Sequence, residues 1–287
     1  MQDGADKRGP TSADKVLGVL SLFTAERSVW SPESAARRMR VSLATGYRYF
    51  NTLVACGMLE KLHRNQYVLG PAIVELDRQV RAADPVLKLA QPVMERLLRR
   101  LREPAAILLC RYYRQKVMCI HQETNRGGEP VSSYERGTLH PMFRGATSKV
   151  ILAHLPPRTI VNLWRDHRQE IVATGMGPGF EDFKAALRTL RHLPVNVSSN
   201  EVDEGRTGIA APIFDAAGRV NGSLSIVLLS PPANSRAVSR LSIAVQAAAR
   251  EIEHGRVAGA GKAETRKTKS PKTTSSKTTW AKTGSKT

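Results

Sequence analysis

A run of polar and basic side chains between residues 42 and 51 has the chemistry of a nucleic-acid contact. Hydroxyl, amide and guanidinium groups can pair with phosphate oxygens and with base edges in the major groove of duplex DNA. The candidates in this run are Ser42, Ala44, Thr45, Gly46, Tyr47, Arg48 and Asn51. Arg48 is the best single candidate, because a guanidinium can form two parallel hydrogen bonds with guanine.

Two other pairs of residues raise the possibility of catalysis. Cys119 and His121 are two positions apart in an apolar run, so a strand would place them on one face, and Ser148 precedes Lys149 as in some activated serines. A catalytic site needs a nucleophile, a base and an orienting group together, and the sequence contains no Gly-x-Ser-x-Gly motif and no histidine with metal-ligand spacing to acids. We therefore expect no enzyme activity, no metal and no cofactor, with an enzyme kept as a minor alternative.

Two helices joined by a tight turn must position the polar run. Ser31 is a candidate N-cap with Pro32 at the first helical position, and this helix should stop near Val41. Ser42 then caps a second helix, whose inward stripe we expect to be Ala44, Tyr47, Leu53 and Val54. The groups expected to project away from that stripe are Thr45, Gly46, Arg48, Tyr49 and Asn51.

A further helix and a hairpin complete this module. The helix follows Ser12 and presents Val16, Leu17, Leu20 and Phe23 at helical spacing. Strands are expected at Met58–Leu62 and Gln66–Leu69, around a polar turn of His63, Arg64 and Asn65. Arg64 could reach a phosphate or the minor groove from this turn. The order predicts a winged helix-turn-helix over residues 12–70, preceded by a flexible segment at residues 1–11.

Residues 71–83 predict a linker helix with an apolar stripe of its own. The stripe comprises Ala72, Ile73, Leu76 and Val80, and it suggests contact with a second copy of the chain. We expect a homodimer, or a tetramer built as a dimer of dimers.

Residues 84–255 predict a second, α+β domain. A helix starting at Pro85 has one apolar face and an Arg-rich opposite face, and helices are also expected at residues 145–155, 180–190 and 238–252. Strands of a central antiparallel sheet are expected at Ala105–Tyr112, Lys116–Gln122, Val131–Tyr134, Ile209–Phe214 and Ser223–Leu229.

Charge is unevenly distributed in this chain of 287 residues, which carries a formal net charge of +19. Residues 256–287 hold nine basic residues and one acid, and their Lys, Ser and Thr composition predicts a disordered basic tail. Three cysteines without Cys-x-x-Cys spacing, a polar N-terminus and no long apolar run favour a cytoplasmic protein that does not enter membranes.

Three segments make the chain resemble IclR-family transcriptional regulators over about residues 12–254. They are residues 44–53, in which Arg48 matches the family pattern and Ala44 replaces its usual serine, residues 137–149, and residues 205–215 with their companion at 223–226. The resemblance implies a winged helix-turn-helix, a linker helix and a GAF/PAS-like effector-binding domain. Within residues 137–149, backbone N–H groups at a helix start would favour an anion such as a carboxylate.

The resemblance also implies an effector pocket in the second domain. Carried over by position, its lining would be Ala146, Thr147, Ser198, Gly208 and Ser225. Ser198 stands where the family often has an acid and Gly208 where it often has a cysteine. Both substitutions leave more space and fewer fixed hydrogen bonds, which suits a ligand larger than a short keto acid or differently charged. Arg144 and Arg206 are possible carboxylate partners, although each is more often a surface residue.

These observations predict a sequence-specific transcriptional regulator that binds a double-stranded DNA operator under the control of a small organic acid. In a bacterial cell it would be cytoplasmic and associated with the nucleoid when bound to DNA. The alternative is a nonspecific or architectural DNA-binding protein, which the basic tail alone would suit.

Overall fold

The structure is a computed structural model that describes residues 11–125, 131–229 and 235–267. The chain divides into two compact units, Met1–Asp84 and Pro85–Thr287. Each unit has its own hydrophobic core, so each is treated by itself.

Three helices build the N-terminal unit; the second and third begin at the caps that the sequence predicts, Ser31 and Ser42, whereas the first is capped by Thr11. They are α1 (Ser12–Leu20), α2 (Pro32–Met39) and α3 (Leu43–Ala55). The hydroxyl of Ser31 accepts from the N–H of Ser34, and that of Ser42 accepts from the N–H of Thr45. The left-handed conformation of Arg40, at φ 55°, ends α2 and allows α3 to follow almost at once.

The inward face of α3 differs from the expected one. Gly46, Tyr49, Phe50 and Leu53 are buried, whereas Val54 is 38% exposed. The predicted stripe was therefore wrong except at Leu53: Ala44 is exposed and Tyr47 half-buried, while Gly46 and Tyr49, predicted to face outward, lie in the interior. The cause is close packing of α2, because a Cβ atom at Gly46 would lie 2.8 Å from the carbonyl oxygen of Pro32.

The wing is confirmed as an antiparallel hairpin of β1 (Leu59–His63) and β2 (Gln66–Leu69). It is joined to the helical core by backbone hydrogen bonds in both directions between Trp30 and Tyr67, of 3.0 and 2.8 Å. The ring of Tyr67 also packs edge-on against Phe50 at 5.0 Å. The expected linker helix follows as α4 (Pro71–Ala83), and none of its residues is buried.

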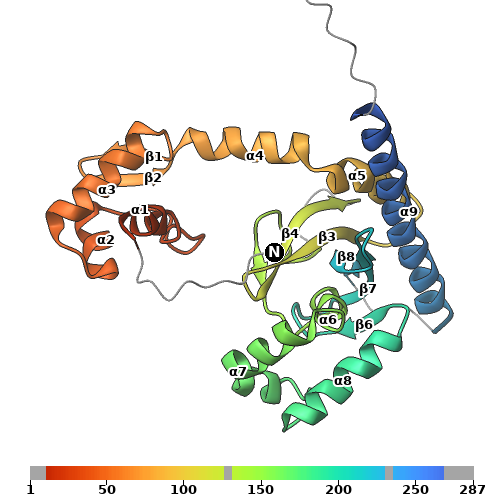
Figure 1. The fold of residues 1–287 in the computed structure, drawn as a ribbon. Helices are drawn as coiled ribbons and strands as arrows, with labels where there is room; N and C mark the ends of the chain where they lie inside the picture. The colour runs from red at the N-terminus through yellow and green to blue at the C-terminus, as the bar shows by residue number, and fades with distance from the viewer. Residues whose placement is uncertain (1–10, 126–130, 230–234, 268–287) are drawn as a thin grey trace, which may run out of the picture. The chain divides into compact units, whose positions relative to one another are not determined.

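A six-stranded antiparallel sheet forms the centre of the C-terminal unit (Figure 1). Its spatial order is β5-β4-β3-β8-β7-β6. The strands are β3 (Ala105–Tyr113), β4 (Lys116–Thr124), β5 (Leu139–His140), β6 (Asn196–Ser199), β7 (Thr207–Phe214) and β8 (Val220–Leu228).

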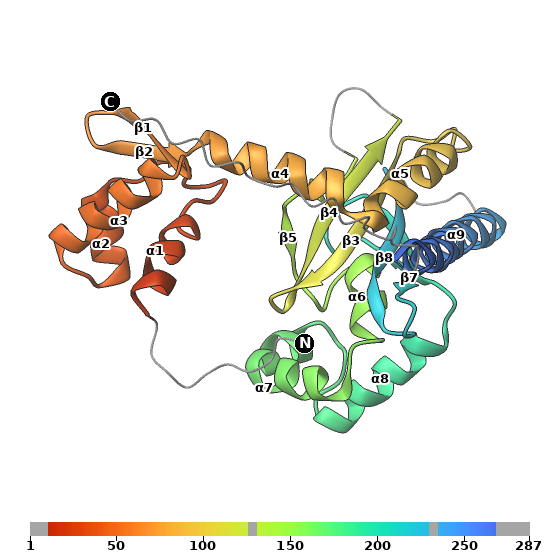
Figure 2. The ribbon, with the colours of Figure 1, turned by 45° about the horizontal axis from the view of Figure 1, so that its top comes forward.

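Helices cover both faces of this sheet, as Figures 1 and 2 show. On one face lie α6 (Ala146–Leu152), α7 (Pro157–Ala173) and α8 (Phe180–His192), and on the other α5 (Pro85–Leu98) and α9 (Ser235–Lys267). Alternate residues of β3 serve the two cores: Leu108 and Cys110 pack on the α6 side, Ile107 and Leu109 on the α5 side.

The strand expected at Val131–Tyr134 is wrong, and β5 takes that place beside β4. The backbone there bonds to side chains instead of to a neighbouring strand: Tyr134 N–H donates to Ser132 Oγ at 3.2 Å, and Ser133 N–H donates to Asp203 Oδ2 at 2.9 Å. Three of the described elements, β5, α7 and β6, were not predicted at all.

The expected basic tail overlaps the end of α9. Helix α9 continues to Lys267, so residues 256–267 are helical and the predicted disorder from residue 256 was wrong for them. Residues 268–287 of the predicted tail, and residues 1–10 of the predicted flexible N-terminus, lie outside the described residues.

A β-bulge separates the two residues that we considered as a catalytic pair. Cys119 is the partner of Cys110, but His121 is the partner of Leu109, so the register shifts between them. Cross-strand partners share a face, and Cys110 and Leu109 belong to opposite cores. Cys119 and His121 therefore lie on opposite faces, contrary to the prediction from simple alternation.

Candidate functional site

The outer face of α3 presents hydrogen-bonding groups without an apolar cover. Ser42, Ala44, Arg48 and Asn51 are exposed and Thr45 is half-buried. The guanidinium of Arg48 lies 6.0 Å from the ring of Tyr49 and forms no ion pair within the described part of the chain. Five of the seven residues singled out between positions 42 and 51 thus share an accessible face; Gly46 is buried and does not.

Tyr47 is the seventh, and its hydroxyl is already bonded within the protein. It donates to the carboxylate of Glu33 on α2 and accepts from the side-chain amide of Asn65 in the wing turn, at 2.6 Å. Arg64, the other wing candidate, is exposed at the same turn with a positive φ of 31°. The wing tip therefore lies beside the first half of α3.

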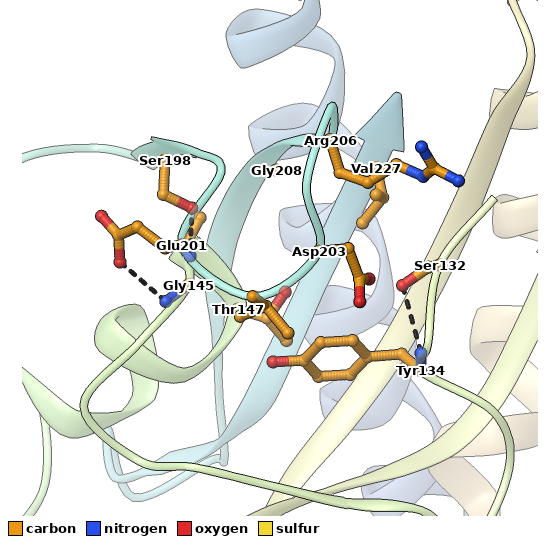
Figure 3. A pocket seen from close by; sticks show the side chains of 12 residues that line it. Ser132, Tyr134, Gly145, Thr147, Ser198, Glu201, Asp203, Arg206, Gly208 and Val227 are labelled. Atoms are coloured by element: carbon orange, nitrogen blue, oxygen red, sulfur yellow. Dashed lines mark hydrogen bonds between the residues drawn. The ribbon is translucent and has the colours of Figure 1, made fainter. Parts of the chain in front are cut away.

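A pocket in the C-terminal unit opens where α6 begins, between the ends of β6 and β7 (Figure 3). The volume open to the centres of water-sized molecules is about 30 Å³, room for about two water molecules, so the walls must move apart for a larger ligand to enter. The lining residues are Ser132, Tyr134, Gly145, Ala146, Thr147, Ser198, Glu201, Val202, Asp203, Arg206, Gly208 and Val227.

Four of the five predicted effector residues line this pocket: Ala146, Thr147, Ser198 and Gly208. Ser198 on β6 accepts a hydrogen bond from Ala146 N–H at 2.7 Å, which fixes the first turn of α6 against the sheet. Ser225 does not line the pocket. It is buried behind Thr147 and accepts a hydrogen bond from the Thr147 hydroxyl at 2.9 Å, so it supports the wall from beneath.

A carboxylate of the protein itself occupies one wall. Glu201 Oε2 accepts from Gly145 N–H at 2.8 Å and lies 2.6 Å from the ammonium of Lys149 (Figure 3 draws the former bond). Sequence reasoning missed Glu201 and Asp203, which lie in the connection between β6 and β7. The available signal was the acidic, glycine-containing stretch at residues 200–205, which is typical of an ordered surface loop.

Tyr134 was also missed, because its segment was predicted as a strand. Its ring stacks on His140 with centroids 3.5 Å apart, and its hydroxyl lies 3.4 Å from Ser148 Oγ. Burial raises the pKa of the Tyr134 hydroxyl and lowers the pKa of His140, so both rings stay uncharged at neutral pH. Tyr134 thus offers an aromatic, neutral side to the pocket, and His140, which does not line it, supports the Tyr134 ring by stacking.

The two arginines considered as carboxylate partners are placed differently. Arg144 is exposed and does not line the pocket. Arg206 does line it, but its Nε donates to the carbonyl of Val131 at 2.7 Å, and its guanidinium points away from Thr147 and Tyr134 in Figure 3.

The second candidate catalytic pair has other partners. Ser148 is fully buried with Tyr134 as its side-chain neighbour, and Lys149 is engaged by Glu201. The described residues include no group of three or more His, Cys, Asp or Glu side chains able to hold a metal ion. None of the helices that the structure describes combines the length and hydrophobicity needed to cross a membrane.

Comparison with solved structures shows where this architecture recurs. An IclR homologue from Microbacterium hydrocarbonoxydans, solved in complex with 4-hydroxybenzoate, superposes with a TM-score of 0.68 at 21% identity, covering 86% of this chain and all of that one. An IclR regulator from Alicyclobacillus acidocaldarius gives a TM-score of 0.69 at 21% identity, covering 87% and 99%.

Sequence comparison gives the same relationship. The regulator BhcR of Paracoccus denitrificans is 26% identical over 259 residues, 87% of this chain and 88% of that protein. KipR of Bacillus subtilis is 26% identical over 216 residues, 74% and 83% of the two chains. Both are described as HTH-type transcriptional regulators.

Two family models match the chain and together account for most of its length. The IclR helix-turn-helix domain matches residues 12–63, and the bacterial transcriptional regulator IclR C-terminal domain matches residues 79–254. The chain thus belongs to the IclR family of bacterial transcriptional regulators, with a DNA-binding helix-turn-helix domain followed by an effector-binding domain.

Proposed function

We propose that this regulator binds its operator through the exposed face of α3 and the wing. The observation that carries the proposal is the set of accessible polar groups on one side of α3, with Arg48 at its centre and no acidic partner for it among the described residues. Arg48 would contact a base, while Ser42, Thr45, Asn51 and Arg64 would contact bases or phosphates. Ala44 would supply an apolar contact, and the buried Gly46 would only let the two helices approach each other.

We further propose that a small organic acid in the pocket of the C-terminal unit changes operator affinity. Tyr134, Val202 and Val227 provide surface for an apolar or aromatic body, and Thr147 and Ser198 provide hydroxyls. The relative solved with 4-hydroxybenzoate supports an aromatic acid as the first ligand class to test.

The charge of a bound acid would be repelled by the carboxylates that already line the pocket, those of Glu201 and Asp203. Like charges disfavour each other, so an acid would enter by replacing Glu201 at Gly145 N–H and Lys149 Nζ. That the protein holds a carboxylate there supports the view that these two groups suit an acid. The bound ligand would then change the conformation of the loop that carries Glu201. If the ligand binds one conformation of the regulator more tightly than the other, it shifts the protein toward that conformation and so changes DNA affinity.

The functional form would be a homodimer or a dimer of dimers, working in the cytoplasm where the operator lies. On α4, Val74 is 73% exposed and Val80 is 58% exposed, and a second copy could cover them. Paired recognition helices would then reach two half-sites about one helical turn apart.

A gel shift on DNA from upstream of the protein's own gene tests the proposal. Random competitor DNA is added in excess, and a panel of aromatic and aliphatic acids is titrated. Retention that resists competitor and changes with one acid supports both parts. Retention lost to competitor, and indifferent to every acid, would instead favour a nonspecific DNA-binding protein.

A further inference from the structure

Three side chains from three different elements of the N-terminal unit meet beside the wing tip. Asn65 Nδ2 lies 2.6 Å from Glu33 Oε1 and 2.6 Å from the hydroxyl of Tyr47, and that hydroxyl donates to the same oxygen of Glu33. Glu33 lies in the first turn of α2, Tyr47 in the first half of α3, and Asn65 in the turn between β1 and β2. A single carboxylate oxygen therefore joins the wing to both helices of the helix-turn-helix pair.

The wing turn depends on such support, because its backbone is unusual. Arg64 has a φ of 31° and Asn65 a φ of 145°, and neither residue is glycine. Residues other than glycine rarely adopt these φ values. Such a backbone conformation persists only where surrounding contacts impose it. Here those contacts are the hydrogen bonds from the side-chain amide of Asn65 to Glu33 and to Tyr47.

Charge and protonation suit a lasting contact. The hydrogen bond from Tyr47 lowers the pKa of Glu33, and the same bond raises the pKa of Tyr47. At neutral pH the carboxylate is therefore ionised and the hydroxyl keeps its proton, which are the states that the bond requires. Glu33 Oε1 therefore accepts two hydrogen bonds from within the protein, one from Tyr47 and one from Asn65.

We infer that Glu33, Tyr47 and Asn65 form a clamp that holds Arg64 beside α3, and that they are positioning residues for DNA binding. This rests on the proposed function, and of the two contacts named there for Arg64 it takes the phosphate. Fixing Asn65 fixes the adjacent Arg64, so the wing does not have to be ordered when DNA binds. The clamp also fixes the distance between the wing contact and the bases that Arg48 reaches.

The test compares full-length variants on a duplex that the wild-type protein selects from a random pool. Asn65→Gly removes the amide but accepts the positive φ, and Tyr47→Phe removes only the hydroxyl. Both variants should bind DNA about tenfold more weakly than wild type. In both, the plot of log affinity against log salt should become less steep by about one, which is also the result expected for Arg64→Ala. Tyr113→Phe, an exposed tyrosine of the other unit, is the matched control and should bind as wild type.

The double variant Arg64→Ala/Asn65→Gly decides whether the amide acts through Arg64. A clamp predicts that the double variant binds no more weakly than Arg64→Ala alone, since the positioned group is already gone. Thermal unfolding confirms that each variant is folded at the assay temperature. Additive losses, or wild-type affinity and slope in both Asn65→Gly and Tyr47→Phe, would overturn the clamp.

Arg64→Ala separates this inference from the proposed function. If Arg64→Ala weakens binding but the clamp variants do not, DNA contact by the wing stands and the clamp is wrong. If Arg64→Ala binds as wild type while Arg48→Ala does not, the wing makes no contact, and the clamp fails with that part of the proposed function.

Discussion

The carboxylate of Glu201 and the ammonium of Lys149 form an ion pair of 2.6 Å beside the effector pocket. Their side chains are only 32% and 16% exposed, so water screens the pair less than it would at an open surface. Gly145 N–H donates to the same carboxylate at 2.8 Å. The pocket thus contains an internal acid at the position that we assign to the acid group of the effector.

Removing that internal acid should strengthen the binding of organic acids. In Glu201→Ala, Lys149 and Gly145 N–H lose their partner, and a bound carboxylate would restore it. We expect affinity for a benzoate to rise about tenfold, or about 1.4 kcal/mol, because a like charge is removed and an unpaired cation is neutralised. Isothermal titration of the full-length protein measures the change.

Glu204→Ala is the matched control, since Glu204 is an exposed carboxylate in the same loop and does not line this pocket. It should leave affinity for the acid as in wild type. If both variants gain affinity equally, the effect comes from net charge and the role given to Glu201 is wrong.

Arg48→Ala should weaken operator binding by about 1 to 3 kcal/mol if the guanidinium pairs with a guanine. The loss should fall on the operator more than on random DNA, because a base contact carries sequence information. A competition gel shift reports the ratio of the two affinities. Arg100→Ala, an exposed arginine in the C-terminal unit, serves as the control, and unchanged binding by Arg48→Ala would remove this residue from the interface.

Gly46→Ala should destabilise the N-terminal unit, although alanine is the better helix former. The added Cβ would lie 2.8 Å from the Pro32 carbonyl and 2.9 Å from the Ala36 Cβ, so α2 and α3 must separate. Overpacking of this kind costs about 1 to 3 kcal/mol. Thermal or denaturant unfolding measures the loss.

Gly18→Ala provides the opposite expectation in a neighbouring helix. Its added Cβ would contact only the flexible end of Met39, at 3.7 Å. No clash opposes the higher helix propensity of alanine, so the free energy of unfolding should rise by about 0.5 to 1 kcal/mol. Equal effects at the two glycines would contradict the assignment of Gly46 to helix packing.

Local signals predicted most elements of the fold. Ser31 and Ser42 do cap α2 and α3, and two strands do flank the predicted polar turn, although His63 ends β1 and only residues 64 and 65 form the turn. The errors arose where tertiary contacts prevail over pattern. The rotation of α3 is set by the approach of α2 at Gly46, and the direction of His121 is set by a bulge that sequence alternation does not reveal.

The pocket was predicted only in part for a similar reason. Ala146, Thr147, Ser198 and Gly208 lie on regular elements, whose positions follow from the family resemblance. Tyr134, Glu201 and Asp203 lie in connections, whose paths depend on contacts such as that between Ser133 N–H and Asp203 Oδ2. No periodicity in the sequence encodes such contacts.

The last prediction concerns assembly through α4. Val74→Asp places a charge at a position that is 73% exposed, so the folded protomer should tolerate it. An interface that buries this position should be destabilised, because the charge would lose its hydration there. Burial of a valine contributes about 1.5 to 3 kcal/mol, so dimer dissociation should become at least about tenfold easier. Sedimentation equilibrium at micromolar concentration measures the mass. Val161→Asp, on an exposed face of α7, is the control and should leave the mass unchanged. A wild-type protein that sediments as a monomer would refute assembly through α4, because no interface would then exist for Val74 to join.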